Sequence, residues 1–264
     1  MRHIKPLYLS SVIVVCITMA FCMSYTHASS QTISDDKKWN FLADAYLMFP
    51  YMNGEVSLGE SITYPVDATA GDIFNKLQMG AMLYFEAKTE KWAITSDMVY
   101  MNLTQDVSPT TLIPSGSVGA KQLIWEAAGL YRIFSYWEIG LGGRLNYLQT
   151  NIDAQRNVLL PAGTEVVRDS YSKTWFDPVI ITRFSTDIKD KWLFQFRGDV
   201  GGFGIGSELT WHLQGYAGYR FTQVFQLSAG YRVLSTDFKS RDDQKEFRFC
   251  VKEFGPVLRL GFNF

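Results

Sequence analysis

Long runs in which every second residue is apolar are the feature that most constrains the fold of this chain. Between residues 192 and 200 one parity is apolar and the other is mostly polar; the apolar one holds Trp192, Phe194, Phe196 and Val200. Successive side chains of a β-strand point to opposite faces, so such a run predicts a strand with two unlike faces. The same period returns along most of the chain after its first few dozen residues, and a helical period is almost absent. The sequence therefore predicts an all-β protein.

Ten segments carry this alternation and are predicted as strands, at roughly 39–50, 76–87, 91–103, 120–133, 136–149, 174–186, 191–201, 206–220, 223–237 and 247–264. Most reach the 9–11 or so residues that a tilted strand needs to cross a bilayer. Their links alternate between tight turns and longer loops, the longer ones at 51–75, 104–119, 150–173 and 238–246. This predicts a single closed antiparallel transmembrane β-barrel of about ten strands, within a range of eight to twelve. The segment 54–63 offers an extra hairpin, and Asp72-Ile73-Phe74-Asn75 is expected in a loop.

The first 28 residues have the layout of a secretory signal peptide. A positively charged start precedes an apolar stretch of about a dozen residues, and small residues stand before a cut after Ala28. A membrane anchor is the alternative, but this stretch is shorter than the ~20 residues of a spanning helix. A lipoprotein cleaved before Cys22 is a further alternative, which the bulky Phe21 disfavours.

Cleavage would leave a short periplasmic segment at 29–38 and a barrel domain at 39–264. The net charge would change from −1 to about −3, because Arg2 and Lys5 are removed. A nucleic-acid partner is not expected, since that function needs a clustered basic face. Cys250 would be the only remaining thiol, so no internal disulfide is expected.

Three features assign the apolar parity to lipid rather than to a protein core. Aromatic residues stand at matching strand ends, which predicts an interfacial girdle of Trp39, Trp92, Trp137, Trp192 and Phe264. Lys gathers in turns, whereas Arg, Asp and Glu occupy the polar parity inside strands, and Arg is the usual cation of enclosed pairs. Ten tilted strands also enclose too small a bore for so many inward rings.

The last nine residues, PVLRLGFNF, are predicted as the closing strand of the barrel. Its lipid-facing residues would be Phe254, Pro256, Leu258, Leu260, Phe262 and Phe264. Arg259 and Asn263 would face the lumen. Closure matters because an unpaired sheet edge does not survive in hydrocarbon.

A signal peptide, alternating strands and a final Phe resemble the bacterial outer-membrane β-barrel proteins. The pieces Asp177-Pro178, Gly198–Gly204, Gly230-Tyr231-Arg232 and Gly255-Pro256 also resemble a widespread, mostly uncharacterised set of these barrels. The resemblance implies the outer membrane of a Gram-negative bacterium, contact with outer-membrane lipid, and recognition of the C-terminal strand by the barrel assembly machinery. It carries no functional residues with it.

Charges of both signs on the polar parity predict a paired network that plugs or lines the bore. Its members are Asp97, Glu126, Arg144, Asp177, Arg183, Arg197, Asp199, Glu208, Arg220 and Arg232. The same parity also carries Asp44, Glu86, Arg132, Glu138 and Arg259.

His212 is the weak catalytic candidate, with Asp199 and Glu208 near it in sequence. A hydrolase would need a nucleophile and a base in hydrogen-bond reach. Ser207 is the nearest hydroxyl, but it shares parity with Leu209 and is expected to point away from His212. No metal site and no cofactor are predicted, because one His and one Cys on distant strands are too few ligands for a transition metal.

These observations favour a non-enzymatic barrel, either structural or forming a narrow polar pore for small solutes. Two alternatives stay open. One is an outer-membrane hydrolase that acts on lipid A or peptides. The other is a surface adhesin or partner-binding barrel that uses its longer loops to hold a surface ligand.

Overall fold

The computed structural model describes residues 39–58, 62–106, 115–159, 162–188, 191–240 and 247–264. The predicted signal peptide (1–28) and periplasmic segment (29–38) lie outside these residues. Within them the chain forms strands and one short helix, α2 (Ala70–Lys76). The strands are β1 (Asn40–Met48), β2 (Tyr51–Leu58), β3 (Ile62–Ala68), β4 (Leu77–Lys88), β5 (Trp92–Asp106), β6 (Ser115–Phe134), β7 (Trp137–Leu159), β8 (Ala162–Ile188), β9 (Trp192–Gly201), β10 (Leu209–Arg220), β11 (Phe225–Ser240) and β12 (Phe247–Asn263).

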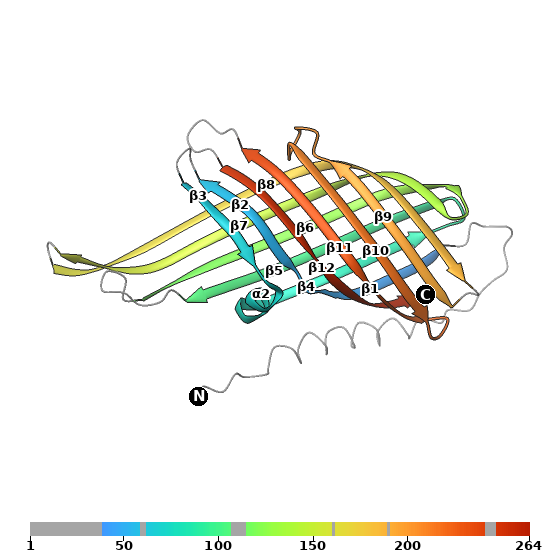
Figure 1. Cartoon of the computed structure of the whole chain (residues 1–264), viewed down its shortest axis with the longest axis horizontal. Helices are drawn as coiled ribbons and strands as arrows, with labels where there is room; N and C mark the ends of the chain where they lie inside the picture. Colours follow the sequence, from blue (N-terminus) through green and yellow to red (C-terminus); the bar gives the residue numbers. More distant parts are fainter. Residues whose placement is uncertain (1–38, 59–61, 107–114, 160–161, 189–190, 241–246) are drawn as a thin grey trace, which may run out of the picture. The chain divides into compact units, whose positions relative to one another are not determined.

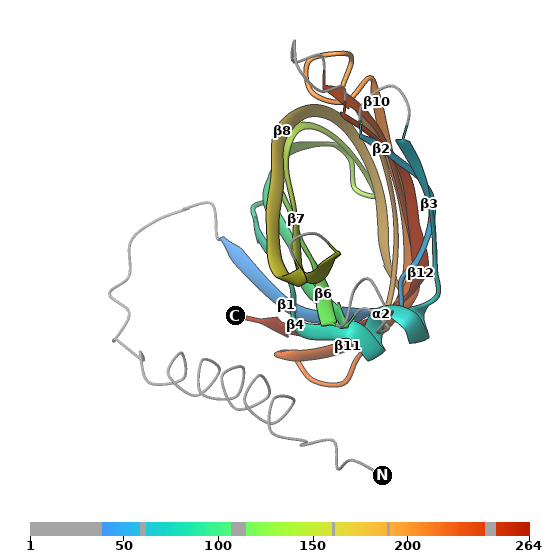
Figure 2. The same cartoon turned by 90° about the vertical axis from the view of Figure 1, so that its left-hand side faces the viewer.

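Ten of these strands close into a ring. The order is β1-β4-β5-β6-β7-β8-β9-β10-β11-β12, every neighbouring pair is antiparallel, and β12 pairs back onto β1 (Figure 1). Seen along its axis, the ring encloses one lumen (Figure 2). The predicted all-β fold, a closed antiparallel barrel of about ten strands, is confirmed.

The hairpin of β2 and β3 lies outside this ring, where the sequence offered an extra hairpin at 54–63. β1 pairs with the C-terminal half of β12, and β2 continues along its N-terminal half. The two are separate strands because Pro50, between them, has a fixed φ and no N–H for a ladder bond. Phe49 just before it still donates to the Pro256 carbonyl at 2.9 Å.

The loop predicted at residues 72–75 is wrong, because these residues lie in α2. Thr69 caps the helix. Its side chain accepts a hydrogen bond from the Asp72 N–H at 3.3 Å, and Asp72 Oδ2 accepts one from the Thr69 N–H at 3.0 Å. Hydrogen bonds from the Thr69 hydroxyl and N–H also lower the pKa of Asp72. Ile73 of this helix is buried inside the barrel among Val99 and Met101.

No helix among the described residues is both long enough and apolar enough to span a membrane.

The outward face carries an apolar band between two rows of aromatic rings. On β7 the band runs from Trp137 through Leu141 to Tyr147, and the next outward residues are Gln149 and Asn151. The ten residue-to-residue steps from Trp137 to Tyr147, at about 3.3 Å each and tilted by about 40°, span about 25 Å. Ring contacts connect the strands at the tight-turn end, for example Trp137–Phe184 at 5.9 Å, Phe225–Phe262 at 5.7 Å and Phe41–Phe264 at 5.7 Å.

β7 and β8 extend far beyond this band at the other end of the barrel (Figure 1). The long loop predicted at 150–173 is therefore strand in its described residues, with β7 paired to β8 as far as Leu159 and Ala162. Of the loop predicted at 104–119, residues 104–106 and 115–119 lie in β5 and β6, and the rest lie outside the described residues. The outward face of this extension carries a ladder of polar side chains. Gln149 bonds to Asn151 at 3.0 Å, and the Ser170 hydroxyl donates to Asn151 at 2.8 Å. The alternation of apolar residues stops here: Arg168, Asp169 and Ser170 are consecutive and all exposed, so this part of β8 has no apolar parity that would predict a strand.

The interior holds apolar clusters as well as charges. One surrounds Met48, Val99, Ile124, Leu234 and Val257, together with Ile73 of α2. A second cluster is also buried inside the barrel, nearer the end opposite the tight turns. It contains Trp175, Phe238, Phe247, Phe249 and Val251. Side chains therefore fill much of the bore at these levels.

Candidate functional site

The centre of the lumen is a cluster of two arginines and two carboxylates. Arg144 Nη2 lies 2.7 Å from Glu126 Oε2 and 2.7 Å from Asp199 Oδ1, and its Nη1 donates to Thr210 at 3.1 Å. Arg197 pairs with the other oxygen of Glu126 and lies 3.2 Å from Asp199 Oδ2. The four charges are buried and balance one another. They come from β6, β7 and β9, whose polar parity points inward.

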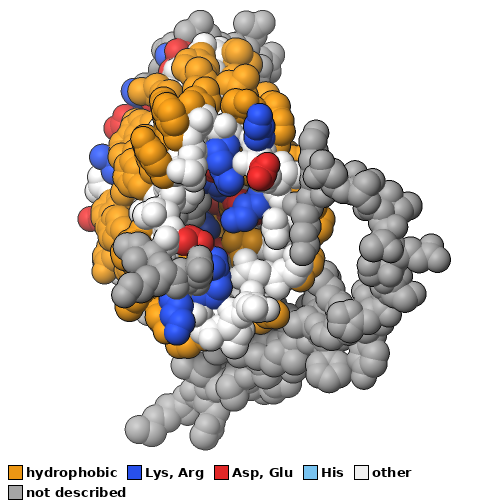
Figure 3. All heavy atoms as spheres, turned by 90° about the vertical axis from the view of Figure 1, so that its right-hand side faces the viewer, with side chains coloured by type: hydrophobic (Ala, Val, Ile, Leu, Met, Phe, Trp, Pro, Cys, Tyr) orange, Lys and Arg blue, Asp and Glu red, His pale blue; other side chains and the backbone are white. Residues whose placement is uncertain are grey.

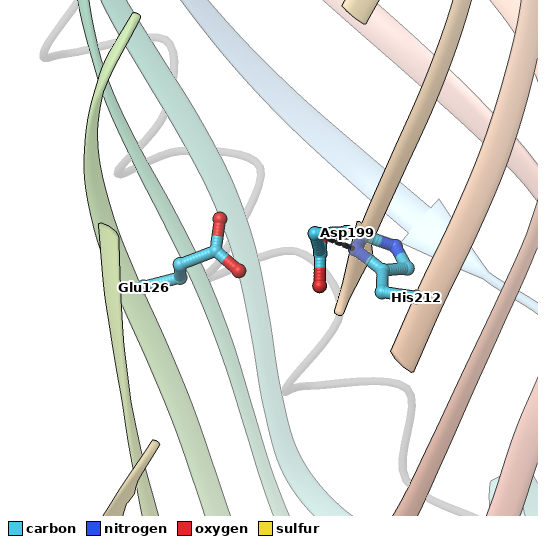
Figure 4. Close-up of side chains that lie close together, drawn as sticks. All are labelled: Glu126, Asp199 and His212. Atoms are coloured by element: carbon cyan, nitrogen blue, oxygen red, sulfur yellow. Dashed lines mark hydrogen bonds and ion pairs between the residues drawn. The ribbon is translucent and has the colours of Figure 1, made fainter. Parts of the chain in front are cut away.

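His212 completes this cluster from β10. Its Nδ1 lies 3.0 Å from Asp199 Oδ2, while its Nε2 has no partner among the described residues. Figure 4 shows Asp199 and His212 together, with Glu126 opposite them. One ligand atom from each of these three residues lies within 4.8 Å of the others, a spacing that suits a metal ion. A cation there would have to displace Arg144 and Arg197 from the same oxygens, and these arginines already match both negative charges.

A second cluster lies nearer the tight-turn end. Arg183 pairs with Glu86 and, at 2.5 Å, with Glu138. Arg132 lies 2.9 Å from Glu138, and the Tyr84 hydroxyl donates to Glu86 at 2.6 Å. Charged side chains of this kind gather in the hollow at this end of the barrel, inside a wall of apolar ones (Figure 3).

A third group joins β1, β5, β11 and β12. Arg232 lies 2.9 Å from Asp97, and the Tyr46 hydroxyl donates to Asp97 at 2.5 Å. Arg259 of the last strand is 3.5 Å from Asp44. Its guanidinium also sits over the rings of three tyrosines, Tyr46, Tyr84 and Tyr216, at 5.0, 4.9 and 4.1 Å. Such contacts stabilise a desolvated cation.

The structure thus brings together Asp97, Glu126, Arg144, Arg183, Arg197, Asp199 and Arg232 as buried, paired charges in the lumen. Three predicted members lie elsewhere. Asp177 is fully buried but bonds to the neutral groups of Asn146, at 2.9 Å, and Ser207, also at 2.9 Å. Arg220 lies near the tight turns, 3.3 Å from the half-exposed Asp187.

Glu208 is the third predicted member that lies outside the buried network, and its side chain is exposed. It lies in the turn before β10, which begins at Leu209, three residues later than the sequence predicted. The alternation of faces does not extend back into this turn. For the same reason Ser207 is buried instead of pointing outward with Leu209, and it bonds to Asp177 and Trp175.

The predicted catalytic group lacks a nucleophile in the described residues. The Ser207 hydroxyl donates to Asp177 at 2.9 Å and accepts from Trp175 Nε1 at 3.0 Å, whereas His212 is bonded to Asp199. His212 is 1% exposed. A substrate would therefore have no path to its ring without a rearrangement of the surrounding charges.

The predicted girdle residues lie on the outside at the tight-turn end. Trp39, Trp92, Trp192 and Phe264 are exposed, and Trp137 is half-buried between Phe134 and Phe184. Further outward aromatic residues, which were not predicted as part of a girdle, lie towards the far end of the apolar band; they include Tyr51, Trp125, Tyr147, Phe176 and Trp211.

The tyrosines around Arg259 were also missed. Tyr46 and Tyr84 each lie two residues from an inward carboxylate, Asp44 and Glu86, so parity alone would have placed them inside. The predicted lumen network contained charged residues only and so omitted these tyrosines, although a tyrosine hydroxyl is a natural partner for buried charges.

Comparisons with known proteins return distant likenesses only. No protein-family model matches the sequence, and none of the curated proteins matches it. Solved structures do match. The outer membrane protease OmpT from Escherichia coli is 9% identical, with 89% of this chain and 99% of that chain covered and a TM-score of 0.46. The translocator domain of the autotransporter NalP from Neisseria meningitidis is 10% identical, with 96% of each chain covered and a TM-score of 0.40. Ail, the attachment invasion locus protein of Yersinia pestis, is 10% identical, with 87% and 100% covered and a TM-score of 0.35.

Proposed function

We propose that this protein is an integral barrel of the bacterial outer membrane whose lumen is closed by its own paired charges. Its role would be non-enzymatic: to anchor and display the sheet formed by the outer parts of β6, β7 and β8. The single observation that carries this proposal is the burial of Arg144, Arg183, Arg197 and Arg232, each at most 4% exposed. In a water-filled pore, the side chains of the lumen arginines would be exposed to solvent.

The membrane location is supported by the outward face. Apolar side chains such as Leu141, 69% exposed, and Phe176, 52% exposed, would be unusual on a water-facing wall. They lie in a band about 25 Å tall with aromatic rows at both edges, as the hydrocarbon of a bilayer requires. Polar Gln149 and Asn151 follow directly beyond the band on β7.

The outward extension favours display over transport. β7 continues for a dozen residues past Tyr147, and β8 covers it along its whole length. Strands this long exceed what a bilayer requires. An adhesin or partner-binding barrel would use such a surface, whereas a pore has no need of it.

The expected result in planar bilayers is that the purified, folded wild-type protein gives no conductance steps. Folding is checked first by a gel shift between boiled and unboiled samples. The variant Glu126→Ala/Arg144→Ala keeps the charge balance and removes two side chains from the bore, so conductance in this variant alone would show that side chains close the lumen. Steady wild-type steps that change in Arg197→Ala or Asp199→Ala would instead identify a pore.

A further inference from the structure

A notch interrupts the barrel wall above the turn between β9 and β10. The ladder of β8 with β9 ends at the pair Val179–Gly201, and that of β10 with β11 ends at Leu209–Asp237. β8 and β11 both continue further outward than these pairs. Beyond the turn, two neighbouring wall strands are thus missing between β8 and β11.

The notch is an open hollow with a volume of about 540 Å³. This volume lies within the range of about 300–1,000 Å³ that is usual for small-molecule sites. Its lining combines aromatic rings, hydroxyls and charges of both signs; it includes Thr174, Trp175, Phe176, Glu208, Phe238 and Lys239.

The inner wall of the notch is a pair of stacked rings. Trp175 and Phe238 lie 4.2 Å apart between ring centroids, with their planes at 14°. Trp175 Nε1 donates to the Ser207 hydroxyl at 3.0 Å, and this hydroxyl is itself held by Asp177 at 2.9 Å. Because both rings are buried and Trp175 is bonded to the turn, the inner wall is formed before any ligand arrives.

The two sides of the notch rim differ in polarity. Towards the apolar band it carries Phe176, 52% exposed, and Ile205, 73% exposed, with Phe203 beside them on the turn. Away from the band, β8 continues into polar Thr174, Ser172 and Ser170. A ligand in the notch would therefore meet hydrocarbon on one side and water on the other.

We propose that the notch binds an amphipathic lipid of the outer leaflet, with an acyl chain along Phe176 and Ile205 and a hydroxyl- and phosphate-bearing head inside the notch. This proposal rests on the membrane location proposed above. Thr174 and Glu208 supply partners for hydroxyl groups, and Lys239 supplies a cation for a phosphate. A ligand without an apolar part would make no favourable contact with the exposed Ile205.

Two variants test the two halves of the ligand site. Thr174→Trp fills the notch, and its matched control is Ser172→Trp, an exposed position two residues further out that does not line it. Ile205→Ser removes the apolar rim, and its matched control is Val224→Ser, an exposed apolar position in a turn at the opposite end. Each protein is reconstituted in phosphatidylcholine bilayers with and without lipopolysaccharide, and bound lipopolysaccharide is measured after gel filtration.

The expected result is binding by the wild type that falls about tenfold in Thr174→Trp and in Ile205→Ser and is unchanged in both controls, where tenfold corresponds to about 1.4 kcal/mol. Equal binding by all five proteins would overturn the lipid site while leaving the membrane barrel intact. Full competition by the acyl-free phosphorylated saccharide, with no effect of Ile205→Ser, would also overturn it. A protein that enters no bilayer would instead refute the proposed location.

Discussion

Replacing Arg144 with Met is expected to destabilise the barrel by about 3–5 kcal/mol, because it leaves Glu126 and Asp199 buried with one arginine between them. Arg144 is fully buried and its Nη2 touches both carboxylates at 2.7 Å. The measurement is urea unfolding in phosphatidylcholine vesicles, followed by tryptophan fluorescence and extrapolated linearly to water.

Two further variants separate charge balance from simple loss of contacts. Glu126→Gln/Arg144→Met restores neutrality around the remaining Arg197–Asp199 pair, 3.2 Å apart, and is expected to recover more than half of the lost stability. Arg168→Ala breaks the exposed Arg168–Asp153 pair on the extension and should change stability by less than about 1 kcal/mol. If Arg144→Met behaves like Arg168→Ala, the buried network does not hold the lumen together.

Introducing an arginine at Leu141 is the second change with a large expected effect. Leu141 lies outward in the middle of the apolar band on β7 and is 69% exposed. If lipid covers this band, Leu141→Arg should cost about 2–4 kcal/mol in the same unfolding experiment, as arginine does at the middle of a bilayer.

Asn151→Arg is the matched control for that change. It lies on the outward parity of the same strand, beyond the band and within the polar ladder with Gln149 and Ser170. Its effect should stay within about 0.5 kcal/mol, as for an ordinary surface position. Equal effects at Leu141 and Asn151 would mean that both positions face the same solvent.

The parity of the strands made most of the barrel predictable. On β12 it placed Leu258, Leu260 and Phe262 outward and Arg259 inward, and the structure places them there. The period of two is a direct consequence of strand geometry, so it survives errors of a few residues at strand ends. It fails where a strand has ended, which is why Ser207 and Glu208 were assigned to the wrong faces.

Other features were hidden because their causes are not periodic. α2 depends on a capping interaction between Thr69 and Asp72 rather than on an apolar stripe, and it is too short to show a helical period. In the outer part of β8 the consecutive residues Arg168, Asp169 and Ser170 are all exposed, so its strand character comes from pairing with β7 and not from an apolar face. The separation of β1 from β2 follows from Pro50, but its effect depends on β12 continuing alongside both.

The candidate site was predictable in composition and less so in arrangement. Parity sends Glu126, Arg144 and Arg197 into the lumen, but it does not say which strands lie at the same height. That is set by the register between strands, for example Glu126 opposite Arg144, and by contacts across the bore such as Arg144 with Asp199. The notch depends on where four strands end relative to one another, which no local pattern records.

Spin labels along β7 report directly whether lipid covers the apolar face. In a background without native cysteines, single labels at outward positions 139, 141, 145, 149 and 151 are compared for collisions with oxygen, which concentrates in lipid, and with a water-soluble nickel complex. Lipid coverage of the band predicts oxygen-dominated collisions at 139, 141 and 145 and nickel-dominated collisions at 149 and 151, with the change near Tyr147. Nickel-dominated collisions at all five positions would contradict it.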